Sequence, residues 1–168
     1  MKVKVFAACL LALSLTAPLL AQGGRGKAEV TINGKAISID YGRPNWGGQD
    51  RLAAAPVGTV WRLGMNLATH IETSGDLKVG STTLKAGKYT LWAKRTGADT
   101  WALLFHPKTG AWGAPSPSDG FVAETPLKVS KAGAAVEQLT ISLSDNKGKA
   151  GIKIEWGNAV LSGELGVL

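Results

Sequence analysis

Hydrophobic and polar residues alternate in short runs along most of this chain, and turn-forming residues separate the runs. Between Glu29 and Tyr41 the alternation is interrupted once, by Asn33-Gly34. An Asn-Gly pair between alternating runs is a strong hairpin signal, because a type I′ turn needs positive φ at both central positions. We therefore expect a hairpin here, with Ile37 on the face that turns toward the core.

Similar runs continue to the end of the chain. A second small hairpin is expected around Gly80-Ser81, and one helical turn at Leu52–Ala55, which Pro56 would end. The remaining strands are expected at Thr59–Leu63, Ala68–Ser74, Lys88–Lys94, Thr100–His106, Phe121–Val129, Val136–Leu143, Gly151–Trp156 and Ala159–Ser162.

These elements predict an all-β, single-domain β-sandwich of about nine or ten mostly antiparallel strands with little helix. The connections are too short for parallel β-α-β crossovers. The length of 168 residues suits one domain, and 22 glycines suit many turns.

The N-terminal segment has the pattern of a secretory signal peptide. A basic start at Lys2 and Lys4 precedes a mostly apolar stretch from Val5 to Leu20 and a small residue, Ala21. This stretch is shorter than a comfortable membrane span of about 20 residues. We expect cleavage after Ala21, and hence a periplasmic or secreted protein with no transmembrane span after cleavage.

The expected organisation is a signal peptide at residues 1–21, a flexible Gly-rich leader at 22–27 and the β domain at 28–168. An uncleaved membrane anchor and a lipoprotein modified at Cys9 are the alternatives. Because Cys9 is the one cysteine of the chain, cleavage leaves a domain without disulfides, which must be stable through its own core.

The formal net charge of +7 is spread along the chain. Lys94-Arg95 is the tightest basic pair, and no run of five or more basic residues occurs. Nucleic-acid binding needs a clustered basic surface, so we expect no nucleic-acid partner. Dispersed lysines are usually solvated, although an anionic envelope polymer is a second interpretation.

Residues for catalysis or metal binding are sparse. His70, His106 and Glu72 are the one combination that offers zinc ligands, and the His spacings of known zinc motifs are absent, so we expect neither a metal nor a cofactor. Glycoside hydrolysis needs two carboxylates facing each other in a cleft. Asp40, Glu72 and Glu155 are predicted on strands, but sequence alone does not bring them together.

Six tryptophans are more than the packing of a small β domain usually requires. Trp46 and Trp112 fall in Gly- and Pro-rich loops, where they either bind a ligand by stacking or fold back as lids over the core. Trp61, Trp101 and Trp156 fall in predicted strands and are expected in the core.

A second candidate cluster lies at the ends of two predicted strands, where Arg43, Arg62 and Asn66 occur. A guanidinium offers a planar pair of donors that suits a carboxylate or another anion. The alternative is structural, with Arg43 or Arg62 paired to Asp40. The candidate ligand-binding residues are therefore Arg43, Trp46, Arg62, Asn66 and Trp112, and no catalytic residue is assigned.

Four ordered motifs are similar to a known family. They are Ile39-Asp-Tyr-Gly-Arg-Pro44, Val60-Trp-Arg-Leu-Gly-Met-Asn66 with Ala68-Thr69, Leu84-Lys-Ala-Gly-Lys-Tyr-Thr-Leu91, and Trp101–Phe105 followed by Trp112-Gly113. They resemble DUF2911, a family of exported bacterial domains of unknown function, over about residues 28–160. The resemblance implies an exported, mainly β domain and brings no established activity, substrate or cofactor.

The family's signature positions fall on Tyr41, Gly42, Arg43, Pro44, Trp61, Arg62, Gly64, Asn66, Ala68 and Thr69. The chain departs from the family pattern at Leu67, where an acidic residue is usual, and at His106, where an asparagine is common.

Three functions are consistent with the sequence. The first is a non-catalytic exported β-sandwich that binds a small ligand or an envelope polysaccharide through the five candidate residues, gathered around a pocket. The second is a glycan hydrolase that uses two of Asp40, Glu72 and Glu155. The third is a structural or interaction module in which the signature residues only build the fold.

Overall fold

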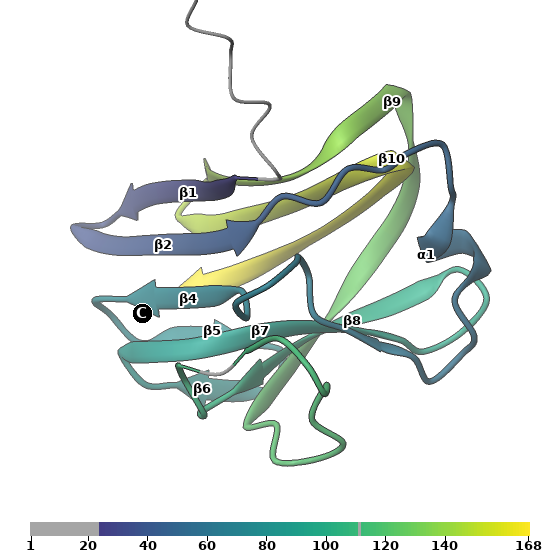
Figure 1. Ribbon diagram of the computed structural model, residues 1–168. Coiled ribbons are helices and arrows are strands. Elements are labelled where there is room, and N and C mark those ends of the chain that lie inside the picture. Colours follow the sequence, from purple (N-terminus) through teal and green to yellow (C-terminus); the bar gives the residue numbers. More distant parts are fainter. Residues whose placement is uncertain (1–23, 111) are drawn as a thin grey trace, which may run out of the picture.

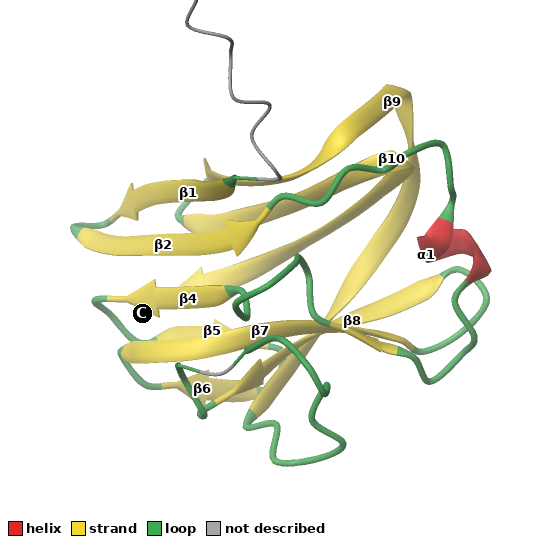
Figure 2. Ribbon diagram, in the orientation of Figure 1, coloured by secondary structure: helices red, strands yellow, loops and turns green. Residues whose placement is uncertain are grey.

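The computed structural model describes residues 24–110 and 112–168, so the predicted signal peptide lies outside the described residues. The described chain forms ten strands and one short helix (Figures 1 and 2). In chain order the elements are β1 Arg25–Ile32, β2 Lys35–Gly42, α1 Arg51–Ala54, β3 Val60–Trp61, β4 His70–Thr73, β5 Leu77–Val79, β6 Thr82–Leu84, β7 Gly87–Arg95, β8 Thr100–His106, β9 Ala123–Asn146 and β10 Lys149–Val167.

The hairpin predicted at Asn33-Gly34 is confirmed. These two residues have φ of 50° and 73° and connect β1 to β2, with Ile32 opposite Lys35. Ile37 is 1% exposed, as the alternation predicts. The positive φ at both turn positions matches the right-handed twist of the strands, which is why the turn chemistry is a dependable signal.

Strand β1 begins at Arg25, inside the segment for which a flexible leader was predicted at residues 22–27. The backbone of β1 pairs with β2 as far as Arg25 opposite Gly42. Gly26 lies so close to the ring of Tyr41 that a Cβ there would stand 2.5 Å from it. A glycine-rich sequence is therefore ordered here by close packing.

All strands belong to one antiparallel sheet, with the order β1-β2-β4-β7-β8-β9-β10-β5-β6 and β3 paired to β7. The all-β fold with little helix is thus confirmed, although one continuous sheet replaces two separate sheets. The sheet folds back on itself, so that the segment after β2 meets β9. Asn45 forms a bridge to Gln138, and the amide of Leu139 donates to the carbonyl oxygen of Pro44 at 3.1 Å.

The last two strands are much longer than the sequence pattern predicts. Four predicted strands merge into β9, of 24 residues, and β10, of 19 residues. The pairing of β9 with β10 shifts register on both sides of Gly157, which has φ of 59°. Bulges of this kind bend a strand without ending it, so the hairpin curves around one end of the molecule (Figure 1).

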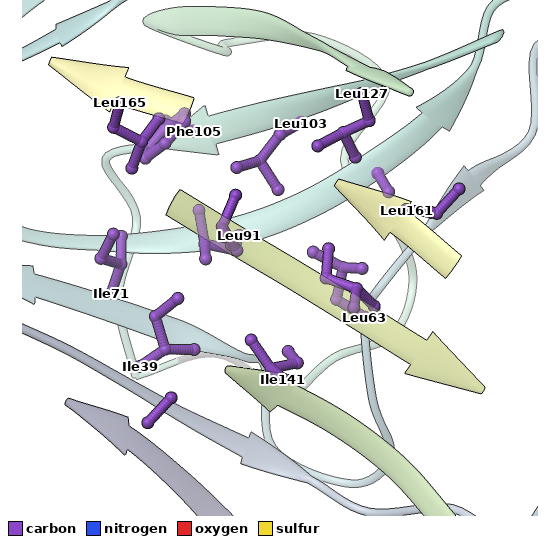
Figure 3. Close-up of a cluster of buried hydrophobic side chains, with 14 of the residues drawn as sticks. Ile39, Leu63, Ile71, Leu91, Leu103, Phe105, Leu127, Ile141, Leu161 and Leu165 are labelled. Atoms are coloured by element: carbon purple, nitrogen blue, oxygen red, sulfur yellow. The ribbon is translucent and has the colours of Figure 1, made fainter. Parts of the chain in front are cut away.

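The main core lies inside the curled sheet and draws side chains from nearly every strand, among them Ile39, Leu91, Leu103 and Phe105 (Figure 3). The opposite face of β7 and β8 carries a smaller cluster that contains Trp92. The hydroxyl oxygen of Thr90 accepts a hydrogen bond from the Nε1 of Trp92 at 3.1 Å. These two strands are therefore buried on both faces.

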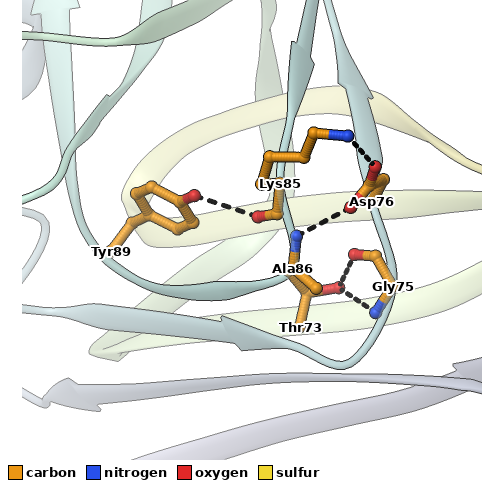
Figure 4. A network of polar contacts seen from close by, with 6 residues as sticks. All are labelled: Thr73, Gly75, Asp76, Lys85, Ala86 and Tyr89. Carbon is orange, nitrogen blue, oxygen red and sulfur yellow. Dashed lines mark hydrogen bonds and ion pairs between the residues drawn. The ribbon is translucent and has the colours of Figure 1, made fainter.

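A polar network joins the two segments that connect the β5–β6 hairpin to β4 and to β7 along the chain (Figure 4). The carboxylate of Asp76 accepts hydrogen bonds from the Nζ of Lys85 and the amide of Ala86, both at 2.9 Å. These bonds lower the pKa of Asp76 and raise the pKa of Lys85. The hydroxyl of Tyr89 donates to the carbonyl of Lys85 at 2.9 Å, and Thr73 is bonded to Gly75.

Candidate functional site

The end of the molecule that carries α1 contains two adjoining cavities. The first, of about 430 Å³, is named here the tryptophan cavity. Its walls include Trp46, Trp101, Trp156, Ser130, Lys131 and Asn158. The second, of about 370 Å³, is named the arginine cavity, and its walls include Arg51, Arg62, Trp61, Met65, Trp101 and Trp156. Arg51, Leu52, Trp101 and Trp156 line both, so the two cavities are neighbours.

Three tryptophans form a fixed aromatic cluster between the cavities. The rings of Trp61 and Trp156 are stacked, with centroids 5.7 Å apart and planes within 10°. Trp101 meets Trp61 edge to face at 6.4 Å. Each such pair contributes about 1 kcal/mol beyond the burial of its area. The Nε1 of Trp156 also donates to the carbonyl of Pro44 at 3.1 Å, so these walls are held in place.

These three tryptophans were expected in the core, and all three pack in the main core cluster, although Trp61 is only half-buried. The same side chains line the cavities. These tryptophans can pack in the core and line a cavity at the same time, because the core reaches the surface at this end of the curled sheet.

Trp46 closes the tryptophan cavity against the bend of the hairpin. Its amide donates to the carbonyl of Glu137 at 2.7 Å, and its ring lies over Gly157. A Cβ at Gly157 would stand 2.2 Å from the indole Nε1. Among the described residues, this buried Nε1 has no hydrogen-bond partner. Trp46 thus folds back on the core and lines a cavity at the same time.

The short helix α1 is held over the cavities by one arginine. Arg95 donates from Nη1 to the carbonyls of Ala53, at 2.8 Å, and Ala55, and from Nε to Gly97 at 3.0 Å. Leu52 is buried beneath the helix. The helix ends before Pro56, as predicted, because the residue before a proline is disfavoured in helical conformation. Arg95 therefore has a structural role.

The side chain of Arg51 extends from α1 toward the aromatic cluster. Its guanidinium carbon lies 5.8 Å from the centre of the Trp156 ring, a cation–π distance. Its Nε donates to the side-chain oxygen of Gln49 at 3.2 Å. The neighbouring carboxylate of Asp50 accepts from Asn158 at 3.3 Å and lines only the tryptophan cavity.

The five predicted site residues do not gather around one cavity. Trp46 lines the tryptophan cavity and Arg62 the arginine cavity, whereas the walls of neither include Arg43, Asn66 or Trp112. Arg43 donates from Nε to the carbonyl of Leu139 at 3.2 Å, which ties the end of β2 to β9. Arg43 therefore has a structural role, which was the alternative interpretation of this residue. Its partner is the backbone of Leu139 and not the predicted Asp40.

Asn66 and Trp112 lie together on another surface. The carbonyl of Asn66 accepts from the amide of Gly113 at 2.9 Å, and Leu67 forms a bridge with Trp112, whose side chain is exposed. The side chain of Arg62 also lies against Gly113. Beside this contact, Ala68 and Phe121 pack against Trp92 on the outer face of β7 and β8.

The carboxylates considered for hydrolysis lie outside both cavities. Asp40 is paired with Arg25, and Glu155 is paired with Lys153 at 3.0 Å. Glu72 lies on β4, diagonal to Asp40 across the strand pair. The sheet therefore presents these acidic groups on its surface, away from the aromatic walls.

The two histidines are also separate. His70 is opposite Thr90, and Thr90 is opposite His106, so one strand stands between them and their Cα atoms are about 10 Å apart. The pKa of His70 is lowered by burial, with a further contribution from the positive charge of Lys88. Among the described residues, no three His, Cys, Asp or Glu side chains are placed to hold a metal ion.

Several residues of this end were not singled out from the sequence. Arg51 had a weak signal, because it directly precedes the one predicted helical turn, Leu52–Ala55, although the helix begins at Arg51. Lys131 and Asn158 had none, because they reach the tryptophan cavity only through the bend of the β9–β10 hairpin.

The fold and the site define an all-β protein with one self-closing sheet and an aromatic, cavity-bearing end. Residues 24–164 match the family described as protein of unknown function, DUF2911, and the chain belongs to this family. No curated protein and no solved structure matches the chain. In the described part of the chain, no helix has the length and apolar character needed to cross a membrane.

Two of the signature glycines lie where the end of β2 touches the loop after β3. A Cβ at Gly42 would stand 2.2 Å from the backbone oxygen of Met65, and a Cβ at Gly64 would stand 3.0 Å from the backbone oxygen of Gly42. The hydroxyl of Thr69 donates to the carbonyl of Leu63 at 2.7 Å. These signature positions therefore build the fold beside the arginine cavity.

Proposed function

We propose that this protein is an exported, non-catalytic binding protein that takes a saccharide, free or within an envelope polymer, in the tryptophan cavity. The observation that supports this most directly is the combination of three indole side chains in one cavity of about 430 Å³. Cavities that bind small molecules have volumes of about 300–1,000 Å³, with mostly apolar walls and a few polar groups.

The walls suit a sugar ring chemically. A pyranose has an apolar C–H face and hydroxyl groups around its edge, so it matches an aromatic surface bordered by donors and acceptors. Trp46, Trp101 and Trp156 provide the aromatic surface. Exposed Asn158 and Lys131 stand at the border, where they can bond to hydroxyl groups.

A hydrolase that uses two of Asp40, Glu72 and Glu155 is not supported, because none of them lines either cavity. Of the two carboxylates that line the tryptophan cavity, Asp50 and Asp99, the first is bonded to Asn158. The aromatic cluster is also fixed by its own stacking and by the bond from Trp156 to Pro44. A preformed cavity loses little entropy on binding, which favours a recognition role.

Blocking the tryptophan cavity tests the proposal. The half-buried methyl group of Ala159 lines this cavity, so Ala159→Leu places extra carbon atoms where the ligand would lie. Titrations of tryptophan fluorescence use peptidoglycan fragments, N-acetylglucosamine oligomers and glucose oligomers. We expect a saturable change with at least one of them, and an affinity at least tenfold lower in Ala159→Leu.

The matched control is Ala135→Leu, which makes the same change at an exposed position of β9 outside both cavities. Its affinity should equal that of the unmodified protein. The absence of a saturable signal across the panel, or equal binding by Ala159→Leu, would contradict the proposal.

Export is tested separately by the N-terminal sequence of the protein recovered from cell fractions. The basic start and the apolar stretch of residues 5–20 support a cleaved signal peptide. We expect the mature protein to begin at Gln22 and to be found outside the cytoplasm. Recovery of the chain with Met1 from the cytoplasmic fraction would contradict export.

A further inference from the structure

We propose that the arginine cavity binds a carboxylate carried on a ring, so that the natural ligand is an acidic saccharide whose uronate ring lies there. This inference rests on the proposed function and adds a charge and a second ring to its ligand. Its basis is that two arginines, Arg51 and Arg62, line a cavity whose walls contain no acidic residue.

The two arginines differ from the others near them in how their donors are used. Arg43 and Arg95 donate to backbone carbonyls, and Arg25 pairs with Asp40. Arg51 has only the neutral amide of Gln49 as a hydrogen-bond acceptor, and no acceptor contacts the guanidinium of Arg62 among residues 24–110 and 112–168. The arginine cavity therefore holds positive charge that no carboxylate in its walls offsets.

The surroundings strengthen the attraction for an anion and select its shape. Trp61, Trp101 and Met65 form an apolar wall of the cavity, and electrostatic interactions are stronger beside apolar groups than in bulk water. A guanidinium binds a planar carboxylate with two parallel hydrogen bonds. The remaining wall is apolar, which suits the ring that carries the carboxylate.

The position of this cavity links it to the proposed saccharide site. Arg51, Leu52, Trp101 and Trp156 belong to the walls of both cavities, so a ligand of two linked rings can occupy both at once. One ring would then lie in the tryptophan cavity and a uronate ring beside Arg62.

The experiment compares three probes on the full chain by isothermal titration calorimetry: digalacturonate, the neutral galactose disaccharide, and benzoate. Each is titrated into the unmodified protein and into Arg62→Gln. The matched control is Arg25→Gln, which removes the same charged group from the ion pair with Asp40 on β1 and β2, outside both cavities. Arg51→Gln, at an exposed position, is a second variant should Arg62→Gln not fold.

We expect digalacturonate to bind at least tenfold more tightly than the neutral disaccharide. This preference should be lost in Arg62→Gln or Arg51→Gln and kept in Arg25→Gln. It should also weaken as the salt concentration rises, because part of the attraction is between charges.

The other outcomes separate this inference from the proposed function. Equal binding of both disaccharides, unaffected by Arg62→Gln, overturns the acidic ligand and leaves saccharide binding standing. Binding of benzoate alone, dependent on Arg62, supports the carboxylate site but assigns it to an aromatic acid and overturns the acidic saccharide. No binding of any of these three probes overturns the acidic ligand, whereas the fluorescence panel above decides whether saccharide binding stands.

Discussion

Replacing Gly42 by alanine is expected to lower the free energy of unfolding by about 3 kcal/mol, a large part of the stability of a small domain. The added Cβ would stand 2.2 Å from the backbone oxygen of Met65. Because the added Cβ meets the backbone of Met65, rotation of a side chain cannot relieve the clash. Strand β2 and the loop after β3 must therefore move apart. Urea denaturation followed by circular dichroism measures the loss.

Gly133→Ala is the control for this substitution. Gly133 lies in β9 with open space around the position of a Cβ, and the change should alter stability by less than about 1 kcal/mol. A Gly42→Ala protein as stable as Gly133→Ala would show that the contact between Gly42 and Met65 is not needed for the fold.

Replacing Gly157 by alanine is expected to cost about 3 kcal/mol as well and to disturb the tryptophan cavity. Part of the cost comes from φ of 59°, which an alanine adopts only at about 1–2 kcal/mol. The rest comes from the clash with the indole of Trp46, 2.2 Å from the added Cβ. We expect a lower urea midpoint, together with a shift of tryptophan fluorescence as Trp46 is displaced.

Two further variants separate these contributions. Gly48→Ala has a similar φ of 74° with nothing within 4 Å, so it measures the backbone cost alone. Combining Gly157→Ala with Trp46→Leu removes the clash, and the double variant should lose less stability than the sum of its single changes. Additive losses would mean that Gly157 and Trp46 are not in the close contact described here.

Local turn chemistry explains which parts of the fold the sequence could predict. Asn33-Gly34 and Gly80-Ser81 both connect the strands that were expected around them. Strand β8 has the predicted bounds, Thr100–His106, because its residues form one apolar run buried on both faces. In each case the sequence pattern that predicts the element and the contacts that form it involve residues close together in the sequence.

The closure of the sheet depends on contacts between distant residues, and the sequence pattern did not reveal it. The strands were predicted to be interrupted at residues 130–135 and 157–158, whereas both segments lie within long strands and Gly157 marks a bulge. The bridge from Asn45 to Gln138 joins segments more than ninety residues apart. No local property of either segment specifies that pairing.

The sequence predicted the types of residue at the candidate site better than it predicted the particular residues. Aromatic and arginine side chains line the cavities, and of the five predicted residues Trp46 and Arg62 are among them. Arg43 instead binds the carbonyl of Leu139, because the closure of the sheet brings β9 beside it. Arg51 and Asn158 join the site through the position of α1 and the bend of β10, which only the tertiary structure defines.

The pairing of β5 with β10 has a consequence for the synthesis of the protein. Leu77 and Lys78 are made early, yet their partners are Val167 and Gly166. While the ribosome is still adding β10, the β5–β6 hairpin lacks its neighbour in the sheet and β9 lacks its longest partner. The sheet can therefore be completed only after β10 has been made. Because its completion waits for pairs that are distant in the sequence, the sheet is expected to form slowly.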